Sequence, residues 1–502
     1  MERRLLLALG LSLLVISLWS VLLQKLSPVP SAPQGVIQPN SLDFKDLEKE
    51  SPPSSAYIYT TEDYQIHFFE EQGAIKEIIF NKYKNYRFFL NEAFSLAMKE
   101  LLFKLDSSVS EKTPTFLYQD EEKRITKRFI PGYPDYLLGL ELGVRNLSGQ
   151  TLVLDLPLVL GVFNLNLPVQ KRGFQEIYLQ GKQRDIRISF PRKEIYLPQV
   201  SFVGWRDRYF CLIVSLENPP EEYAGFIKKS PAKEFKMGME IKRIMLKPQQ
   251  EILFKFRIYL GPQDLKILEK IEPAWSVLVH YGFFDPLTKI LLKVLGFFYR
   301  IVKNWGIAIV LLSLLIYLVL FPLSLKQMRA IKEMTVLQPK IEELRLLYKD
   351  NPQRLHKEMM ELYRKYKINP LGGCLPLILQ MPVFLALYQG LTRSIALKEG
   401  SFLWIKDLSE PDRLFILHTG LPIIGKEINL LPILFIITIF IQQKLSILST
   451  GVGPKEEQRL MSIFFTIFLG IVFYHLPSGL VLYWFINNLL MLIFHLRFRG
   501  LR

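Results

Sequence analysis

The sequence is poor in cysteine and histidine, and this narrows the chemistry open to it. Its 502 residues include 2 cysteines and 6 histidines. Neither Cys211 nor Cys374 has a partner at the spacing of a metal site, so no metal cluster and no disulfide bond are expected. The sequence also lacks an HExxH helix, a GxSxG turn and a phosphate-binding glycine loop. These absences argue against an enzyme and predict no cofactor.

Acidic residues are scarcer than basic ones. The chain has 63 Lys and Arg against 47 Asp and Glu, a formal charge of +16, yet 50% of its residues are hydrophobic. This combination is unusual for a soluble domain and typical of a membrane protein with a basic cytoplasmic face. A nucleic-acid-binding protein is the other class with such a charge. That class is excluded because the basic residues lie between apolar segments that are too long for a soluble core.

Charge is nearly absent from six long apolar segments, which are the expected membrane spans. The first, residues 5–23, is either a signal peptide or a retained anchor. The anchor is favoured, because the segment is long for a signal peptide and no A-x-A cleavage site follows it. The other five spans are expected at residues 305–323, 371–391, 428–448, 460–474 and 480–496. The last two are short, which favours local thinning of the bilayer or tilting.

The loops between the spans predict the orientation. Residues 324–367 contain eleven Lys or Arg against six Asp or Glu, whereas residues 393–427 contain five of each. Because basic loops stay in the cytoplasm, both termini and residues 324–367 are expected there. Residues 24–282 are then expected in the periplasm.

The part outside the membrane divides into a linker and a β domain. Residues 24–56, rich in Pro and Ser, predict a flexible linker. Residues 57–270 alternate apolar and polar positions between Gly, Pro and Asn clusters, which predicts an antiparallel β-sandwich. His67 lies in one such run, where a structural or solvent-facing histidine is expected rather than a ligand. The expected fold class is therefore a multi-pass α-helical membrane bundle of six transmembrane helices plus an all-β sandwich.

An amphipathic helix is expected at residues 283–302. Lys289, Lys293 and Arg300 share one face of it and apolar residues cover the other, which is typical of a helix in the membrane interface. A helix packed on the β-sandwich is the alternative. Residues 303–502 form the expected five-helix core.

A cytoplasmic helical hairpin is expected inside this core, at residues 324–367. Apolar residues recur at helical spacing on both sides of an Asp-Asn-Pro break at 350–352. The basic residues of the hairpin either contact RNA or acidic lipid, or form a solvated face that only sets the topology.

Uncharged polar residues recur in the spans four positions apart, which places each pair on one face of a helix. Such helices either surround a hydrophilic cavity or are joined by interhelical hydrogen bonds of about 1 kcal/mol each. The number of pairs favours the cavity. Ser462 and Thr466 form one pair in the fifth span. The residues predicted to line the cavity are Ser313, Tyr317, Gln380, Thr438, Gln442, Tyr483, Trp484, Asn487 and Asn488.

Four blocks of sequence carry a resemblance to a known family. They read NPLGGCLPLILQMPVFLALY, LPSGLVLYW, LWIKDLS and LQPKI, at residues 369–388, 476–484, 403–409 and 337–341. Together with the order of β domain, interfacial helix, basic hairpin and five-span core, they make the chain similar to the YidC/Oxa/Alb family of membrane protein insertases. The resemblance is to the Gram-negative type with a large periplasmic domain, and it covers nearly the whole chain.

The resemblance implies a non-enzymatic insertase and chaperone of the bacterial inner membrane. A hydrophilic groove, open to the cytoplasm and to lipid, takes the polar part of a nascent segment, which then enters the bilayer. The implied partners are nascent membrane proteins, the Sec translocon (SecYEG and SecDF), the lipid bilayer and the ribosome, the last through the hairpin. The β domain is similar in fold to sugar mutarotases, without an implied mutarotase activity.

One position departs from the family pattern. The groove arginine that the family usually carries in the second span is replaced here by Tyr317. The resemblance therefore implies a neutral groove, in which attraction of acidic substrate segments is in doubt. A small-solute transporter or channel is the alternative function, but it predicts inverted repeats and intramembrane charges, and the sequence has neither.

Overall fold

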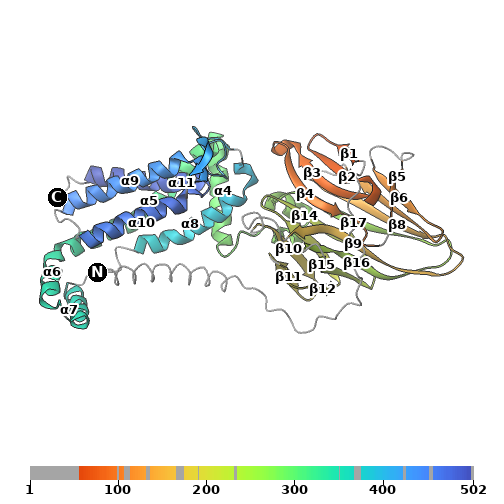
Figure 1. The fold of residues 1–502 in the computed structure, drawn as a ribbon, viewed down its shortest axis with the longest axis horizontal. Helices are drawn as coiled ribbons and strands as arrows, with labels where there is room; N and C mark the ends of the chain where they lie inside the picture. The colour runs from red at the N-terminus through yellow and green to blue at the C-terminus, as the bar shows by residue number, and fades with distance from the viewer. Residues whose placement is uncertain are drawn as a thin grey trace. The chain divides into compact units, whose positions relative to one another are not determined.

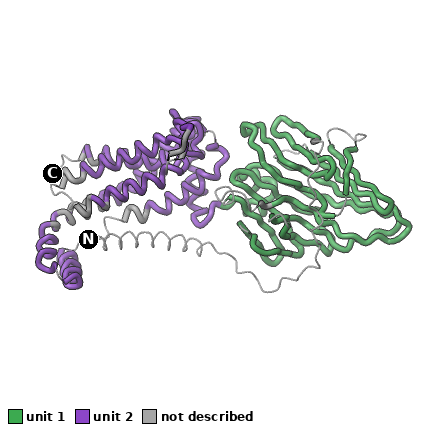
Figure 2. Tube along the Cα trace, viewed as in Figure 1, with its two compact units in different colours: residues 1–280 green, residues 281–502 purple. Residues whose placement is uncertain are grey.

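The computed structural model describes residues 56–98, 101–106, 113–131, 136–164, 174–189, 191–230, 234–349, 351–366, 375–398, 400–421, 425–450 and 456–498. The chain forms two compact units, Met1–His280 and Tyr281–Arg502 (Figures 1 and 2). The expected anchor at 5–23 lies outside the described residues, as does the linker at 24–56 except for its last residue.

The first unit is built of antiparallel strands. Short helices accompany them: η2 (Glu70–Gln72), η3 (Asn81–Tyr83), α3 (Leu265–Ile271) and η4 (Pro273–Leu278). The strands are β1 (Ala56–Thr60), β2 (Tyr64–Phe69), β3 (Ala74–Phe80), β4 (Tyr86–Ala93), β5 (Lys104–Leu105), β6 (Thr115–Gln119), β7 (Lys123–Ile130), β8 (Leu137–Asn146), β9 (Leu152–Asn164), β10 (Glu176–Gly181), β11 (Asp185–Ile188), β12 (Ile195–Pro198), β13 (Val200–Arg206), β14 (Phe210–Glu217), β15 (Tyr223–Ser230), β16 (Glu234–Leu246) and β17 (Glu251–Pro262).

These strands form three sheets that pack face to face. A nine-stranded sheet has the order β11-β10-β13-β14-β17-β8-β7-β6-β5, and two four-stranded sheets have the orders β1-β2-β3-β4 and β12-β15-β16-β9. Aromatic rings join the layers: Phe80 of β3 stacks on Phe210 of β14 with centroids 4.1 Å apart, and Phe68 of β2 meets Phe129 of β7 at 5.0 Å. The predicted β-sandwich is confirmed.

In strand β7, the alternation of side chains between the two faces of the sheet places a lysine in this core. Ile125, Lys127 and Phe129 point to the same face, and none of the three is exposed to solvent. Lys127 therefore occupies a core position. Its ammonium donates to the carbonyl oxygens of Gln72 and Phe94, both at 2.8 Å.

The second unit is helical. Its helices are α4 (Asp285–Val302), α5 (Trp305–Val336), α6 (Gln338–Leu347), α7 (Pro352–Lys365), α8 (Leu375–Arg393), α9 (Leu430–Thr450), α10 (Glu456–Tyr474) and α11 (Ser478–Phe498). Between α8 and α9 lie η6 (Ile395–Leu397) and a small hairpin of β18 (Phe415–Leu421) and β19 (Gly425–Ile428).

Helix α5 joins the second expected span to the first part of the expected hairpin. The expected span ends at residue 323, where hydropathy falls, but α5 continues through Pro322 to Val336. Backbone hydrogen bonds do not depend on side-chain polarity, so one helix passes from an apolar to a basic segment without a break. The hairpin that follows consists of α6 and α7, and Asn351 caps α7 by accepting a hydrogen bond from the Arg354 amide at 3.0 Å.

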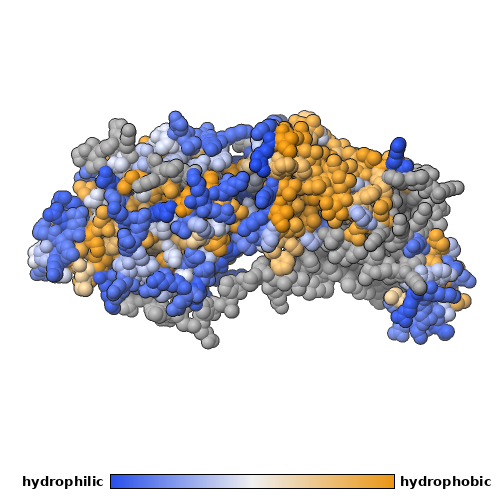
Figure 3. Space-filling model, turned by 180° about the vertical axis from the view of Figure 1, so that it is seen from behind, coloured by the Kyte–Doolittle hydropathy of each residue, from blue (hydrophilic) through white to orange (hydrophobic). Residues whose placement is uncertain are grey.

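The face of the helical unit that Figure 3 shows is apolar over much of the bundle. Val319 on α5 is 69% exposed, and Ile493 on α11 is 54% exposed. Large apolar side chains that face outward on neighbouring helices mark a surface that lipid covers. Within the described residues, Trp305–Leu325 is the one segment long and apolar enough to cross a membrane. The apolar segments Leu430–Leu445, Ser462–Tyr474 and Ser478–Phe494 are shorter. The number of six transmembrane helices stays a prediction.

Candidate functional site

The helical bundle is held together by a core of aromatic rings. Trp484 of α11 lies 5.7 Å from Phe384 of α8 and 5.5 Å from Phe473 of α10, measured between ring centroids. Phe435 of α9 lies 4.8 Å from Phe473. Trp484 was predicted to line the cavity, but its ring joins four helices inside this apolar cluster. Its indole nitrogen is buried and has no hydrogen-bond acceptor among the described residues.

Two of the predicted residues meet across α8 and α11. The amide nitrogen of Gln380 donates a hydrogen bond to the hydroxyl of Tyr483. Tyr483 is fully buried, and Gln380 is half-buried. Asn487, one turn further along α11, donates to the backbone carbonyl of Tyr483 at 2.8 Å. The sequence predicted each of these residues separately, and the fold brings Gln380 and Tyr483 together.

Other predicted residues satisfy their hydrogen bonds within their own helix. The hydroxyl of Ser313 donates to the Ile309 carbonyl at 2.8 Å, and that of Thr438 to the Phe435 carbonyl at 2.7 Å. A hydroxyl bonded to a carbonyl of the preceding turn needs no water and no neighbouring helix as an acceptor. Ser313 and Thr438 are both buried, so they are accommodated in the core without a polar cavity beside them.

The remaining predicted residues are half-buried. The amide of Asn488 donates to the Trp484 carbonyl at 3.0 Å. The ring of Tyr317 lies 5.9 Å from that of Phe321, which in turn meets Phe494 of α11 at 5.1 Å. Gln442 is half-buried on α9.

Sequence reasoning missed a residue that joins α9 to α10. The amide of Gln443 donates to the hydroxyl of Thr466 at 2.8 Å, and Thr466 donates to the Ser462 carbonyl at 2.9 Å. The four-residue spacing singled out Ser462 and Thr466, but it paired Thr438 with Gln442 instead of Gln443. The position of α9 about its own axis, which no local pattern encodes, decides which of two adjacent glutamines faces α10.

A hydrogen-bonded cap closes the end of the bundle where α5, α9 and α11 begin. The carboxylate of Asp412 accepts from the Trp404 indole at 3.0 Å and from the Leu431 amide at the start of α9 at 2.9 Å. Asn429 donates to the Tyr474 carbonyl at 2.8 Å. Leu397, Ile405 and Leu408 are buried beneath these contacts. Polar and apolar contacts together seal this end.

Helix α4 packs against α8 by one face and leaves the other uncovered. Leu291 and Leu295 are buried in the core of the bundle, and Thr288 donates to the Ala386 carbonyl at 3.1 Å. Ile290 and Phe297 lie on the exposed face, at 59% and 51%. An exposed apolar face beside basic residues is typical of a helix in a membrane interface.

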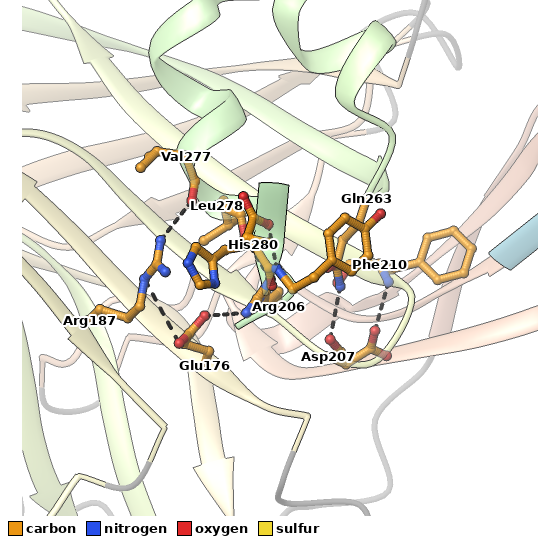
Figure 4. A network of polar contacts seen from close by, with 11 residues as sticks. Glu176, Arg187, Arg206, Asp207, Phe210, Gln263, Val277, Leu278 and His280 are labelled. Atoms are coloured by element: carbon orange, nitrogen blue, oxygen red, sulfur yellow. Dashed lines mark hydrogen bonds and ion pairs between the residues drawn. The ribbon is translucent and has the colours of Figure 1, made fainter. Parts of the chain in front are cut away.

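The β unit contains a buried network of ions at the end of its chain (Figure 4). Arg206 forms an ion pair with Glu176 at 2.5 Å and donates to the carbonyls of Leu278 and His280 at 2.7 and 2.9 Å. Arg187 donates to the Val277 carbonyl at 2.7 Å. Burial lowers the pKa of Arg206, and the Glu176 carboxylate opposes this shift. The network fixes residues 277–280 to strands β10, β11 and β13.

The described residues do not gather a metal centre. Among the described residues, no group of three or more His, Cys, Asp or Glu side chains is placed to hold a metal ion. Cys211 is buried in β14, and burial raises the pKa of its thiol.

A bundle with an apolar surface and a sealed end, joined in one chain to an antiparallel β-sandwich, defines a membrane protein with a large domain outside the bilayer. Two family models match the chain: the 60Kd inner membrane protein over residues 297–499 and the YidC periplasmic domain over residues 91–294. The chain belongs to the family of the membrane protein insertase YidC.

Two relatives support this assignment by their sequences. The chain is 33% identical over 377 residues to the membrane protein insertase YidC of Syntrophobacter fumaroxidans, covering 73% of this chain and 67% of that protein. It is 36% identical over 298 residues to the one from Pelobacter propionicus, covering 59% of this chain and 54% of that protein. A crystal structure of active YidC insertase with its first transmembrane domain resolved is 18% identical, with a TM-score of 0.40, covering 88% of this chain and 92% of that chain.

Proposed function

We propose that this chain inserts hydrophobic segments of nascent membrane proteins into the inner membrane along the polar contact between α8 and α11. The hydrogen bond between Gln380 and Tyr483 carries the proposal, because it joins an amide of α8 to a hydroxyl of α11 next to the aromatic core of the bundle. A half-buried amide is close enough to the surface to exchange its partner for a polar group of a passing chain. The sealed end supports a path that opens on the other side.

Insertion of an apolar segment requires no external source of free energy. Transfer of a segment of about 20 apolar residues into lipid is favourable, and the barrier arises from the polar residues that must cross with it. Hydrogen-bonding groups in the bundle replace part of the water that those residues lose. The protein therefore acts as a catalyst of transfer in the physical sense, without covalent chemistry, and requires no cofactor.

The proposed topology has six transmembrane helices with both termini in the cytoplasm and residues 24–282 in the periplasm. The basic balance of residues 324–367 supports this orientation. The cap formed around Asp412 then lies at the periplasmic end, and the α6–α7 hairpin lies at the cytoplasmic end. We assign residues 1–23 as an anchor and 24–56 as a linker within this scheme.

The proposed groove is neutral. Its members are the predicted residues Tyr317, Gln380, Gln442, Tyr483, Asn487 and Asn488, none of which carries a charge. The other predicted residues, Ser313, Thr438 and Trp484, pack inside the bundle and are not part of it. Tyr317 stands where the family usually carries an arginine, so hydration and hydrogen bonding replace attraction of acidic segments. The proposed partners are nascent membrane proteins and lipid, with the Sec translocon and, through the hairpin, the ribosome.

Photo-crosslinking tests the path. A photoreactive residue in place of Gln380 is expected to crosslink to a stalled nascent inner-membrane protein. The same residue at Val319, exposed on the surface of α5, is the control and is expected to crosslink mainly to lipid. Absence of a nascent-chain crosslink at 380 in a protein that still inserts, or an equal yield at 319, contradicts the proposal.

A double-mutant cycle tests the hydrogen bond itself. Gln380→Leu and Tyr483→Phe are each expected to slow insertion about fivefold, the equivalent of about 1 kcal/mol, and the double variant no further. Thr392→Val on α8 is the matched control, because the Thr392 hydroxyl donates to the Tyr388 carbonyl of its own helix at 2.6 Å. Unchanged insertion in both single variants overturns the role of the pair.

A further inference from the structure

The α6–α7 hairpin has a small core of its own and hence a defined inner and outer face. Leu337, Ile341 and Tyr363 are buried between the two helices, at 2%, 8% and 9% exposure. Lys340 contacts the hydroxyl of Tyr366 across the hairpin. The residues of α6 that follow at the spacing of this face, Leu344 and Tyr348, are half-buried.

Two consecutive leucines at the tip of the hairpin lie on its outer face. Leu346 is 80% exposed and Leu347 is 69% exposed, on a helix whose other outward residues are mostly charged or polar. Two adjacent leucines exposed at the end of a helix form a small apolar patch, which favours an apolar or interfacial partner.

The surroundings of these leucines are basic. Residues 344–357 contain Arg345, Lys349, Arg354 and Lys357 against Asp350 alone. The two acids of α6, Glu342 and Glu343, lie about one turn nearer the base of the hairpin. A small apolar patch with basic residues around it is complementary to a membrane surface that contains anionic lipid.

We propose that the tip of the hairpin docks on the anionic cytoplasmic leaflet, with Leu346 and Leu347 in the headgroup region and the surrounding cations at the lipid phosphates. The inference rests on the proposed topology, which places the hairpin in the cytoplasm. It does not depend on the proposed insertion path.

RNA fits the tip less well. Binding of single-stranded RNA uses aromatic rings on which bases stack. The aromatic residue at the tip is Tyr348, which is half-buried, and the Arg354 guanidinium lies 5.1 Å from its ring centroid. The large apolar side chains displayed at the tip, Leu346 and Leu347, are aliphatic, and aliphatic groups favour lipid over bases.

A fluorescent probe that reports water exclusion tests the docking in the full chain. The two cysteines are replaced (Cys211→Ala, Cys374→Ala), Leu346→Cys is labelled with NBD, and the protein is placed in nanodiscs of phosphatidylcholine with or without phosphatidylglycerol. NBD emission is expected to rise about twofold with the anionic lipid and to fall back at high salt. NBD on Glu361→Cys, an exposed polar position of α7, is the matched control and is expected to be insensitive to lipid charge.

Two further variants distinguish lipid from other partners. Lys349→Gln together with Arg354→Gln is expected to abolish the response to phosphatidylglycerol at position 346. Equal emission in both lipids, or emission that rises only when ribosomes or a nascent chain are added, overturns the proposal. Because the measurement needs no substrate, it stands or falls separately from the proposed insertion path, which the crosslink at position 380 tests.

Discussion

The two units of the chain bury polar side chains in opposite ways. The β unit buries charged groups: Lys127, Glu240 and Arg206 are at most 4% exposed. The helical unit buries neutral groups, such as Ser313 and Thr466, which bond to carbonyls of their own helices. The difference follows from the surrounding solvent. A charge in a unit surrounded by water needs partners only in the folded state, whereas a charge in a bundle surrounded by lipid is costly in every state of the membrane-embedded chain.

Among the described residues of the helical unit, one carboxylate is buried, and its position follows the same rule. Asp412 lies in the cap at the end of the bundle, where it accepts hydrogen bonds from Trp404 and from the first turn of α9. The positive end of the helix dipole favours a negative charge there. Because Asp412 lies at the end of the bundle and not at its middle, it acts as a structural cap and not as a group that a substrate would meet.

The largest expected effect comes from breaking the ion pair of the β unit. Arg206→Met removes the nearer partner of the buried Glu176, which keeps only Arg187 at 3.9 Å, and is expected to destabilise this unit by about 3–5 kcal/mol. The measurement is pulse proteolysis of the full chain in urea. Arg243→Met, at an exposed ion pair with Glu222, is the control and is expected to cost less than about 1 kcal/mol. Equal losses in the two variants would remove the buried network as a source of stability.

A charge placed in the helical unit sharpens the comparison. Ser313→Asp is expected to destabilise the bundle by about 3 kcal/mol, because the site is fully buried beside Ile309 and Leu312. Ser313→Ala, which removes only a hydroxyl bonded to its own helix, is the control and is expected to change little. Unfolding of the reconstituted protein by a denaturing detergent measures both. Tolerance of the aspartate would show that water reaches this part of the bundle.

A smaller effect is expected at the contact between α9 and α10. Gln443→Leu and Thr466→Val are each expected to cost about 0.6–1 kcal/mol, with a coupling of similar size in the double variant. Gln442→Leu, the adjacent glutamine, is expected to show no coupling to Thr466→Val. A coupling at position 442 would mean that the rotation of α9 differs from the one described.

The smallest expected effect is a pH dependence in the β unit. Burial raises the pKa of Asp120, but hydrogen bonds from Lys123, Tyr118 and Glu122 outweigh burial and lower it from 3.8 to about 2. A carboxyl with a depressed pKa in the folded state stabilises the fold above its unfolded pKa, and this contribution is lost as the pH falls from about 4 to about 2. Asp120→Asn is expected to flatten the fall of Tm over this window, measured by circular dichroism. An unchanged slope assigns the acid sensitivity to other groups.

Sequence reasoning reached the architecture because hydropathy and alternation are local signals. The β-sandwich and the family were predicted from runs of residues, and both are confirmed. The continuity of α5 was not predicted, because a fall in hydropathy marks the end of an apolar segment and not the end of a helix. Trp484 lies in the aromatic core, although a polar stripe on α11 placed it in the cavity. Period and composition identify a face of a helix, but not the neighbour that the face meets.

The composition alone established a basic, strongly hydrophobic chain with long uncharged segments, because the cost of charge in lipid restricts sequence directly. Packing alone decided which neutral polar groups meet. Gln380 reaches Tyr483 over a separation of 103 residues, Gln443 instead of Gln442 reaches Thr466, and Lys127 takes a core position in β7. Each of these contacts depends on the rotation and offset of whole elements against one another, which arise from the summed packing of many side chains and not from any local pattern.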